Sequence, residues 1–174
     1  MSVISSLSPL EEISATQKVL ASGNVNYWTG NEGKQFESDF ANYTGCKHAV
    51  AVSNGTVALE LALEAIGIQP GDEVITQGFN FIATIESIID CGAKPVIAPI
   101  DEYLNMDKDA TEKLITKKTK VILCVHLFGH PADVESLKEI CKKNQIYLFD
   151  SGGRELAGGG QIGIRRIELL YGQC

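Results

Sequence analysis

Residues 49–76, AVAVSNGTVALELALEAIGIQPGDEVIT, decide the fold class of this chain. An apolar strand pattern at 49–52 leads through a polar glycine turn, Ser53 to Thr56, into an apolar helix pattern and then a second strand. Backbone N–H groups and the helix dipole favour an anion at such a helix start, so the turn predicts a phosphate site. Ser, Asn and Thr also cap helices without any ligand, and the tetrapeptide alone leaves both interpretations open.

The same alternation continues along the chain. Strands are predicted at 49–52, 74–76, 95–98, 121–125 and 146–149. Helices are predicted at 9–21, 31–43, 56–66, 81–90, 108–115 and 134–143. Alternating β and α elements predict an α/β fold with a mostly parallel sheet covered by helices, and with binding residues at the carboxyl ends of the strands.

Composition narrows the function classes. The chain has 174 residues, of which 44% are hydrophobic, and a formal net charge of −7. These values predict one soluble globular domain and argue against a general binder of nucleic acid or anionic membranes, so a phosphate site would have to be local. No run approaches the roughly 20 apolar residues of a membrane span, and the N-terminal stretch does not resemble an export signal.

The cysteines indicate the compartment. Cys46, Cys91, Cys124, Cys141 and Cys174 make an odd count with no CxxC pair. We interpret them as reduced thiols of a cytoplasmic protein, mostly in its core, rather than as disulfides or metal ligands, and expect no metal site.

Two further features lie at predicted strand ends. Phe79 and Phe81 follow the second strand, where one of them could cover the face of an aromatic ligand, or both could be core residues. Asp150 follows the last predicted strand, where it could serve a binding site or merely cap a turn.

Taken together, several segments resemble one family. They are SNGT (53–56), GDEVI (71–75), GAKPV (92–96), NMD (105–107), TKVILCVHLFG (119–129) and PAD (131–133). The pattern is similar to that of the DegT/StrS-type sugar aminotransferases, and the resemblance runs in register from about Gly23 to Phe149. It implies the three-layer large domain of pyridoxal-phosphate enzymes of fold type I, truncated here, with residues 1–150 as its N-terminal part.

The resemblance also assigns a site for pyridoxal 5′-phosphate. It implies that Gly55 and Thr56 hold the phosphate through backbone N–H and hydroxyl groups, and that Phe81 stacks on the pyridine ring. Asp150 would pair with the protonated pyridine nitrogen and keep the ring an electron sink. His126 and His130 lie in a segment that the family shares, and we expect structural roles for them.

The implied reaction moves an amino group, from an amino acid such as glutamate, to a keto carbon of a nucleotide-linked sugar, as in polysaccharide biosynthesis. Such enzymes usually work as homodimers. The lysine that holds their cofactor follows the aspartate in a Ser-Phe-x-x-x-Lys type of segment, but the last lysine here is Lys143. No catalytic residue is therefore identified, and we expect this chain to be inactive and its dimerisation to be doubtful.

The segment 151–174 leaves the family pattern. Phe149 stands where the family has Glu before the aspartate, and Gly153 stands where it has a polar residue. One hypothesis is a divergent natural tail. The other is a reading-frame shift around 149–153, with the tail translated out of frame.

Two other function classes stay open. A dinucleotide-binding oxidoreductase domain also alternates β and α, but no G-x-G-x-x-G follows the first predicted strand and no acidic residue closes the second at Thr76. A non-catalytic module that binds sugar nucleotides or a partner would be compatible with the missing lysine.

Overall fold

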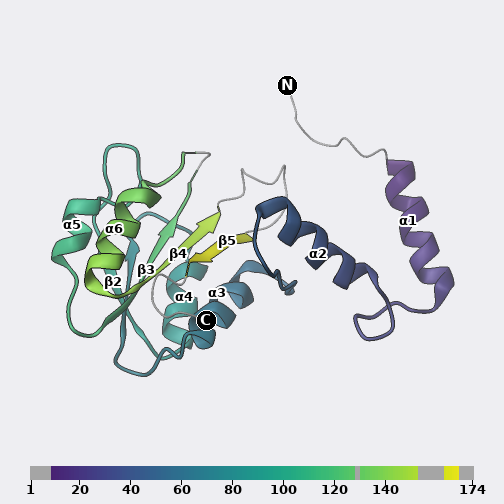
Figure 1. Cartoon of the computed structure of the whole chain (residues 1–174), viewed down its shortest axis with the longest axis horizontal. Coiled ribbons are helices and arrows are strands. Elements are labelled where there is room, and N and C mark those ends of the chain that lie inside the picture. Colours follow the sequence, from purple (N-terminus) through teal and green to yellow (C-terminus); the bar gives the residue numbers. More distant parts are fainter. Residues whose placement is uncertain (1–8, 128–129, 153–162, 169–174) are drawn as a thin grey trace. The chain divides into compact units, whose positions relative to one another are not determined.

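The computed structural model describes residues 9–127, 130–152 and 163–168. The chain divides into two compact units, one within residues 1–51 and the other from Val52 onward (Figure 1). No described helix has both the length and the apolar character needed to cross a membrane.

The first unit consists of two helices and their connections. They are α1 (Pro9–Ser22) and α2 (Glu32–Thr44). Glu37 of α2 ties the unit together, because its carboxylate accepts one hydrogen bond from the Tyr27 hydroxyl at 3.0 Å and another from the Ala51 amide at 2.8 Å. Both helices match the predicted ranges to within one residue at each end.

The second unit is built around a five-stranded sheet. Its elements are α3 (Gly55–Ala65), β1 (Glu73–Gln77), α4 (Ala83–Asp90), β2 (Lys94–Ala98), α5 (Lys108–Lys113), β3 (Thr119–Val125), α6 (Val134–Asn144), β4 (Tyr147–Gly152) and β5 (Gly163–Glu168). The strand order is β2-β1-β3-β4-β5. The first four strands are parallel, and β5 runs antiparallel to β4.

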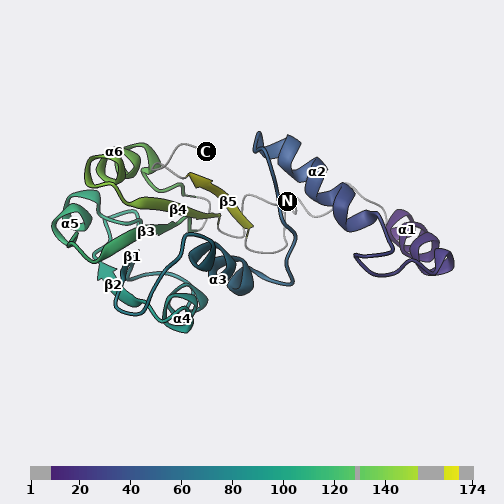
Figure 2. The same cartoon turned by 60° about the horizontal axis from the view of Figure 1, so that its bottom comes forward.

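Helices cover both faces of the sheet, which gives three layers (Figure 2). On one face, α3 and α4 bury residues such as Leu63 and Ile88 against Val121 and Phe149 of the strands. On the other, α6 and the end of α5 bury residues that include Leu137 against strand residues on the opposite face. Alternate residues of each central strand face the two layers, as expected for a sheet buried on both sides. The predicted three-layer α/β class is confirmed.

One predicted strand is wrong. Residues 49–52 form no β-structure, and Val50 is 69% exposed. A strand is stabilised by hydrogen bonds to a neighbouring strand, and no described strand pairs with this segment. The apolar pattern of 49–52 was therefore insufficient by itself to predict β-structure.

A strand that the sequence did not predict lies at the other side of the sheet. β5 pairs with β4 from Leu148 opposite Glu168 to Gly152 opposite Gly163. This pairing satisfies backbone groups on the outer edge of β4 that would otherwise be open to association with other chains.

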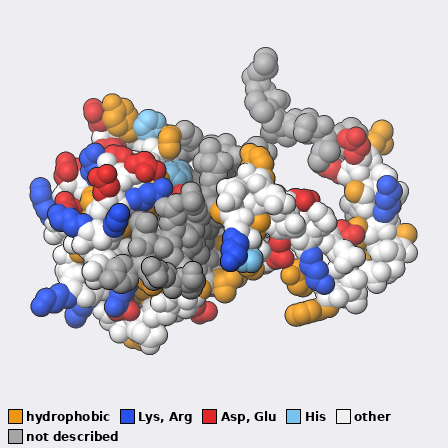
Figure 3. Space-filling view, viewed as in Figure 1, with side chains coloured by type: hydrophobic (Ala, Val, Ile, Leu, Met, Phe, Trp, Pro, Cys, Tyr) orange, Lys and Arg blue, Asp and Glu red, His pale blue; other side chains and the backbone are white. Residues whose placement is uncertain are grey.

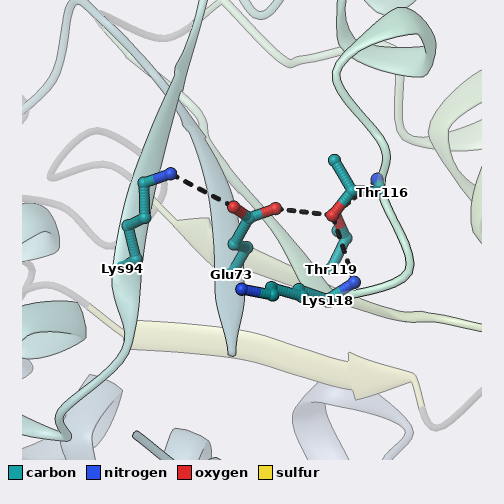
Figure 4. A network of polar contacts seen from close by, with 5 residues as sticks. All are labelled: Glu73, Lys94, Thr116, Lys118 and Thr119. Carbon is teal, nitrogen blue, oxygen red and sulfur yellow. Dashed lines mark hydrogen bonds and ion pairs between the residues drawn. The ribbon is translucent and has the colours of Figure 1, made fainter. Parts of the chain in front are cut away.

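A polar network fixes the amino-terminal ends of the strands (Figure 4). The buried Glu73 carboxylate accepts a hydrogen bond from the Thr116 hydroxyl at 2.7 Å and pairs with Lys94 at 3.2 Å. These contacts lower the pKa of Glu73, the hydroxyl of Thr116 contributing most and Lys94 next. The network connects the starts of β1 and β2 to the turn before β3.

The surface over α5 and α6 carries charges of both signs (Figure 3). Ion pairs there join Lys108 to Asp133 at 3.0 Å and Lys143 to Glu112 at 2.6 Å. This mixed surface offers no basic stripe of the kind that tracks a nucleic-acid backbone.

Candidate functional site

The glycine turn forms the start of α3. One of the first backbone amides of this helix is capped by a side chain, and others remain without an acceptor within the helix. Asn54 is the N-cap, and its side-chain oxygen accepts the amide of Val57 at 3.0 Å. The first amides of a helix have no acceptor within the helix. Because the cap takes the Val57 amide, those of Gly55 and Thr56 remain available to an anion at the positive end of the helix dipole. Capping and phosphate binding, the two interpretations of this turn, are thus compatible.

The direction of α3 places this turn at the carboxyl edge of the sheet. A pocket beside the other end of the helix is lined by Ile66 and Asp72 together with Lys120 and Tyr147, which lie where β3 and β4 begin. α3 therefore runs antiparallel to the strands. Its first residues lie toward the edge where β1, β3 and β4 end, which is where α/β proteins place their ligands.

Phe81 lies at the same edge, in the loop between β1 and α4. The predicted helix start at residue 81 is too early, because α4 begins at Ala83. Phe81 is 61% exposed and Phe79 is 43% exposed, so the alternative that both are core aromatics is wrong. An exposed aromatic face at this edge could cover a flat ligand ring.

Asp150 lies near the end of β4, next to the final residues of β3. Its register partner on β3 is Cys124, and its Oδ2 lies 3.9 Å from Nε2 of His126. The His126 ring is oriented by the amide of Ala132, which donates to Nδ1 at 3.0 Å. The neighbouring strands therefore place one imidazole beside the carboxylate.

The Asp150 carboxylate affects the pKa of the Cys124 thiol. Burial is the main cause that raises the pKa of Cys124, and the negative charge of Asp150 raises it further. The thiol of Cys124 is therefore neutral and does not compensate the charge of Asp150.

The Asp150 carboxylate supplies the test of whether pyridoxal phosphate fits this site. Its Oδ1 is buried and has no hydrogen-bond partner in the part of the chain that the structure describes. A buried acceptor without a donor is unfavourable by roughly 1–3 kcal/mol. A protonated pyridine nitrogen would donate to that oxygen and neutralise its charge, so the residue fits the group.

The four predicted site residues thus come from three elements that end or begin at one edge. Gly55 and Thr56 start α3, Phe81 follows β1, and Asp150 lies two residues before the end of β4. Two neighbours were not predicted to contribute. The sequence predicts a structural role for His126 and gives no prediction for Gln77, although a polar residue at the end of a buried strand is a usable signal.

Comparison with known proteins gives one family. A family model described as the DegT/DnrJ/EryC1/StrS aminotransferase family matches residues 9–152. The GDP-perosamine synthase of Vibrio cholerae is 42% identical over 127 residues, which cover 71% of this chain and 35% of that protein. The chain therefore spans about a third of the length of that curated relative.

Solved structures agree with this result. An aminotransferase from Psychrobacter cryohalolentis superposes with a TM-score of 0.79 at 42% identity, over 83% of this chain and 37% of that one. The E coli GDP-4-keto-6-deoxy-D-mannose-3-dehydratase with bound hydrated PLP gives 0.74 at 29% identity, over 86% of this chain and 40% of that one. The family resemblance predicted from the sequence is confirmed.

Proposed function

Because the chain belongs to the DegT/DnrJ/EryC1/StrS aminotransferase family, we propose that it supplies the phosphate- and ring-binding part of a pyridoxal-phosphate site. The reaction served by that site is transfer of an amino group from an amino acid to a keto carbon of a nucleotide-linked sugar. Glutamate is the proposed donor, and a GDP-linked keto sugar is the proposed acceptor, because the Vibrio cholerae relative is a GDP-perosamine synthase.

The buried, unpartnered Oδ1 of Asp150 is the observation that carries this proposal. A carboxylate in that state requires a donor, and a cationic ring nitrogen provides both the proton and the charge. Neither of the rival functions demands a ring nitrogen that donates a proton, because the cationic nicotinamide nitrogen of an oxidised dinucleotide is bonded to ribose and has no proton. Neither the turn at Gly55 nor the exposed ring of Phe81 would carry the proposal alone, because both features also occur without a cofactor.

Each residue has one task in this proposal. The amides of Gly55 and Thr56, with the Thr56 hydroxyl, bind the phosphate, and Phe81 covers one face of the ring. Asp150 holds a proton on the ring nitrogen. When bound, pyridoxal phosphate supplies an electron sink for the bonds around the amino-bearing carbon.

The proton-transferring lysine is the part that this chain lacks. Its last lysine is Lys143, seven residues before Asp150. We propose that the 174-residue chain alone is inactive and that residues 151–174 follow a reading-frame shift. Translation of the adjoining DNA in the other two frames tests the shift: a Ser-Phe-x-x-x-Lys segment is expected, and its absence from both frames would reject the idea.

Assembly and location complete the proposal. We propose a cytoplasmic homodimer for the full-length enzyme, acting in polysaccharide biosynthesis. The free thiols of Cys124 and Cys141, both buried, support a reducing compartment.

A chimera tests the function directly. Residues 1–150 of this chain are joined to the part of the Vibrio cholerae relative that follows its matching aspartate. The chimera is incubated with glutamate, a GDP-linked 4-keto-6-deoxy sugar and pyridoxal phosphate, and an amino sugar and 2-oxoglutarate are measured. Turnover that depends on the cofactor is expected, with the intact relative as the control.

Two results would contradict the proposal. One is a folded chimera that binds the cofactor but forms no amino sugar. The other is a product that has lost a hydroxyl group without gaining nitrogen, which is the chemistry named for the E coli dehydratase. If the chain instead binds the nucleotide sugar and shows no affinity for the cofactor, the non-catalytic module becomes the better account.

A further inference from the structure

Gln77, the last residue of β1, has a fully buried side chain at the carboxyl edge of the sheet. Its Oε1 accepts the backbone amide of Val125 at 2.9 Å, which comes from the end of β3. Its Nε2 donates to the carbonyl of Phe79 at 3.3 Å and to that of Leu104 at 3.5 Å. One carboxamide therefore joins three segments that are far apart in the sequence.

The backbone around Gln77 adds to these contacts. The side chain of Asn80 donates to the Gln77 carbonyl at 2.8 Å and to the Thr76 hydroxyl at 3.3 Å. The next residue, Gly78, donates its amide to Ala98 at the end of β2 at 3.1 Å. Hydrogen bonds to the end of β1 and to the end of β2 therefore fix the first residues of the loop that follows β1.

The Leu104 carbonyl belongs to a strained turn. Leu104 has a φ of 64°, a left-handed conformation that a residue with a side chain rarely adopts. Asp101 stabilises the turn, because its carboxylate accepts the amides of Tyr103 at 2.8 Å and Asn105 at 2.9 Å. Gln77 connects this turn to the loop after β1, although 27 residues separate them.

The Gln77 carboxamide is buried and hydrogen-bonded through both its oxygen and its nitrogen, so this position strongly favours glutamine over an apolar residue. Replacing it by an apolar side chain would leave one amide and two carbonyls without a partner, and each is costly to bury unpaired. One of the segments that it joins is the loop that carries Phe81, in which Phe79 and Ile82 are exposed as well. Phe81 follows Asn80 directly, and its ring is exposed rather than packed into the core. The position of that ring therefore depends on the loop backbone.

We infer that Gln77 is a positioning residue, which fixes the loop at 78–82 and so presents the Phe81 ring before any ligand binds. The link to a cofactor ring rests on the proposed function. The positioning itself does not, and this separation allows the two ideas to fail independently. Preorganised ligand contacts of this kind lower the cost of binding.

The test compares amide hydrogen exchange, measured by NMR, in the whole chain and in Gln77→Met, which has nearly the same length but forms none of these bonds. Thr119→Val is the matched control, because Thr119 is also buried and its hydroxyl accepts the Thr116 amide at 2.9 Å at the other end of the sheet. Ile122, in the middle of β3, reports global opening.

The expected result is local. In Gln77→Met the amides of Val125 and Gly78 exchange about tenfold faster relative to Ile122, since one net hydrogen bond is a factor of roughly 3 to 10. In Thr119→Val the exchange rates of the Val125 and Gly78 amides, relative to that of Ile122, stay unchanged. Equal acceleration of all three amides in Gln77→Met would show a purely structural role and overturn the inference.

A measurement on the unchanged protein covers the case in which the variant does not fold. The carboxamide protons of Gln77 should exchange at least about tenfold more slowly than those of the exposed Gln17. Equal rates for the two side chains would overturn the inference without any substitution.

Titration with pyridoxamine 5′-phosphate then separates the two ideas. If both ideas hold, Gln77→Met and Phe81→Leu each weaken binding of pyridoxamine 5′-phosphate severalfold. The double variant then has no lower affinity than the single variant that binds more weakly. Additive losses would show that Gln77 does not act through Phe81. If the unchanged chain binds none while the exchange result holds, the proposed function fails and the positioning role of Gln77 stands.

Discussion

Nε2 of His126 lies 3.9 Å from Oδ2 of Asp150, and the other ring nitrogen of His126 accepts the amide of Ala132 at 3.0 Å. A neutral imidazole has one donor and one acceptor nitrogen. Since Nδ1 is the acceptor, the proton resides on Nε2, on the side of the carboxylate. The residue that follows β3 thus provides Asp150 with a neighbour that can donate a hydrogen bond when its ring is neutral.

This arrangement predicts the tautomer of His126. In ¹⁵N NMR spectra above pH 7, Nδ1 of His126 should show the shift of an unprotonated ring nitrogen, and Nε2 that of a protonated one. The exposed His48 serves as the reference for a ring that exchanges between tautomers. A protonated Nδ1 in the neutral ring would contradict the contact with Ala132.

The Glu73 network predicts a pH-dependent contribution to stability. The Thr116 hydroxyl and Lys94 lower the pKa of Glu73 below its ordinary value of 4.5, so the ionised form stabilises the folded state. This stabilisation is complete above that ordinary value and is lost as the pH falls through the lower folded one. Glu73→Gln should therefore lower the free energy of unfolding by about 1 kcal/mol at pH 7, and by less at pH 3.

Denaturant unfolding at the two pH values checks this prediction. The Glu102→Gln variant, which removes the same charge from an exposed loop position, is the control and should change stability little. A loss for Glu73→Gln that is equally large at pH 7 and pH 3 would show that the ionised carboxylate does not stabilise the network.

The missing lysine predicts a chain without turnover. No lysine follows Asp150, because Lys143 is the last one in the sequence, and a lysine is the group that holds this cofactor as a Schiff base. Purified protein should therefore form no amino sugar from glutamate and a keto nucleotide sugar. Borohydride reduction followed by mass spectrometry should find no site-specific lysine adduct with pyridoxal phosphate, and a specific adduct at Lys143 would overturn this expectation.

The exposed ring of Phe81 predicts a specific loss of affinity. Phe81→Leu should weaken binding of pyridoxamine 5′-phosphate about 2- to 12-fold, because ring stacking contributes roughly 0.5–1.5 kcal/mol. Phe79→Leu, in the same loop, should have little effect. Equal losses in the two variants, measured by calorimetry, would show that the sequence resemblance selected the wrong aromatic residue.

The sequence predicted most elements of this fold because their patterns are local. The strands around Ile75, Ile122 and Leu148 have short apolar patterns, and the turns between elements carry Gly, Pro or capping residues. Asp133, for example, caps α6 by accepting the Ser136 amide at 3.2 Å. Such signals require no knowledge of tertiary contacts.

Other features depend on pairings between distant residues. The segment at 49–52 has a strand pattern but no partner, and the pairing of β5 with β4 depends on the position of β4 in the sheet. The contact between His126 and Asp150 follows from the β3–β4 register, and the contacts of Gln77 with Val125 and Leu104 span 48 and 27 residues. No local pattern encodes these distances.

The most direct test of the central claim, that Asp150 receives a protonated pyridine nitrogen, is calorimetric titration of the chain and of Asp150→Asn with pyridoxamine 5′-phosphate. The amine form is chosen because it cannot react with surface lysines. The account predicts a single site in the unchanged chain and an affinity at least about tenfold lower in Asp150→Asn, since a hydrogen bond to a charged group contributes roughly 1.5–3 kcal/mol. Competition by inorganic phosphate should be the same in both proteins. Equal affinities of the two proteins for pyridoxamine 5′-phosphate would contradict the account.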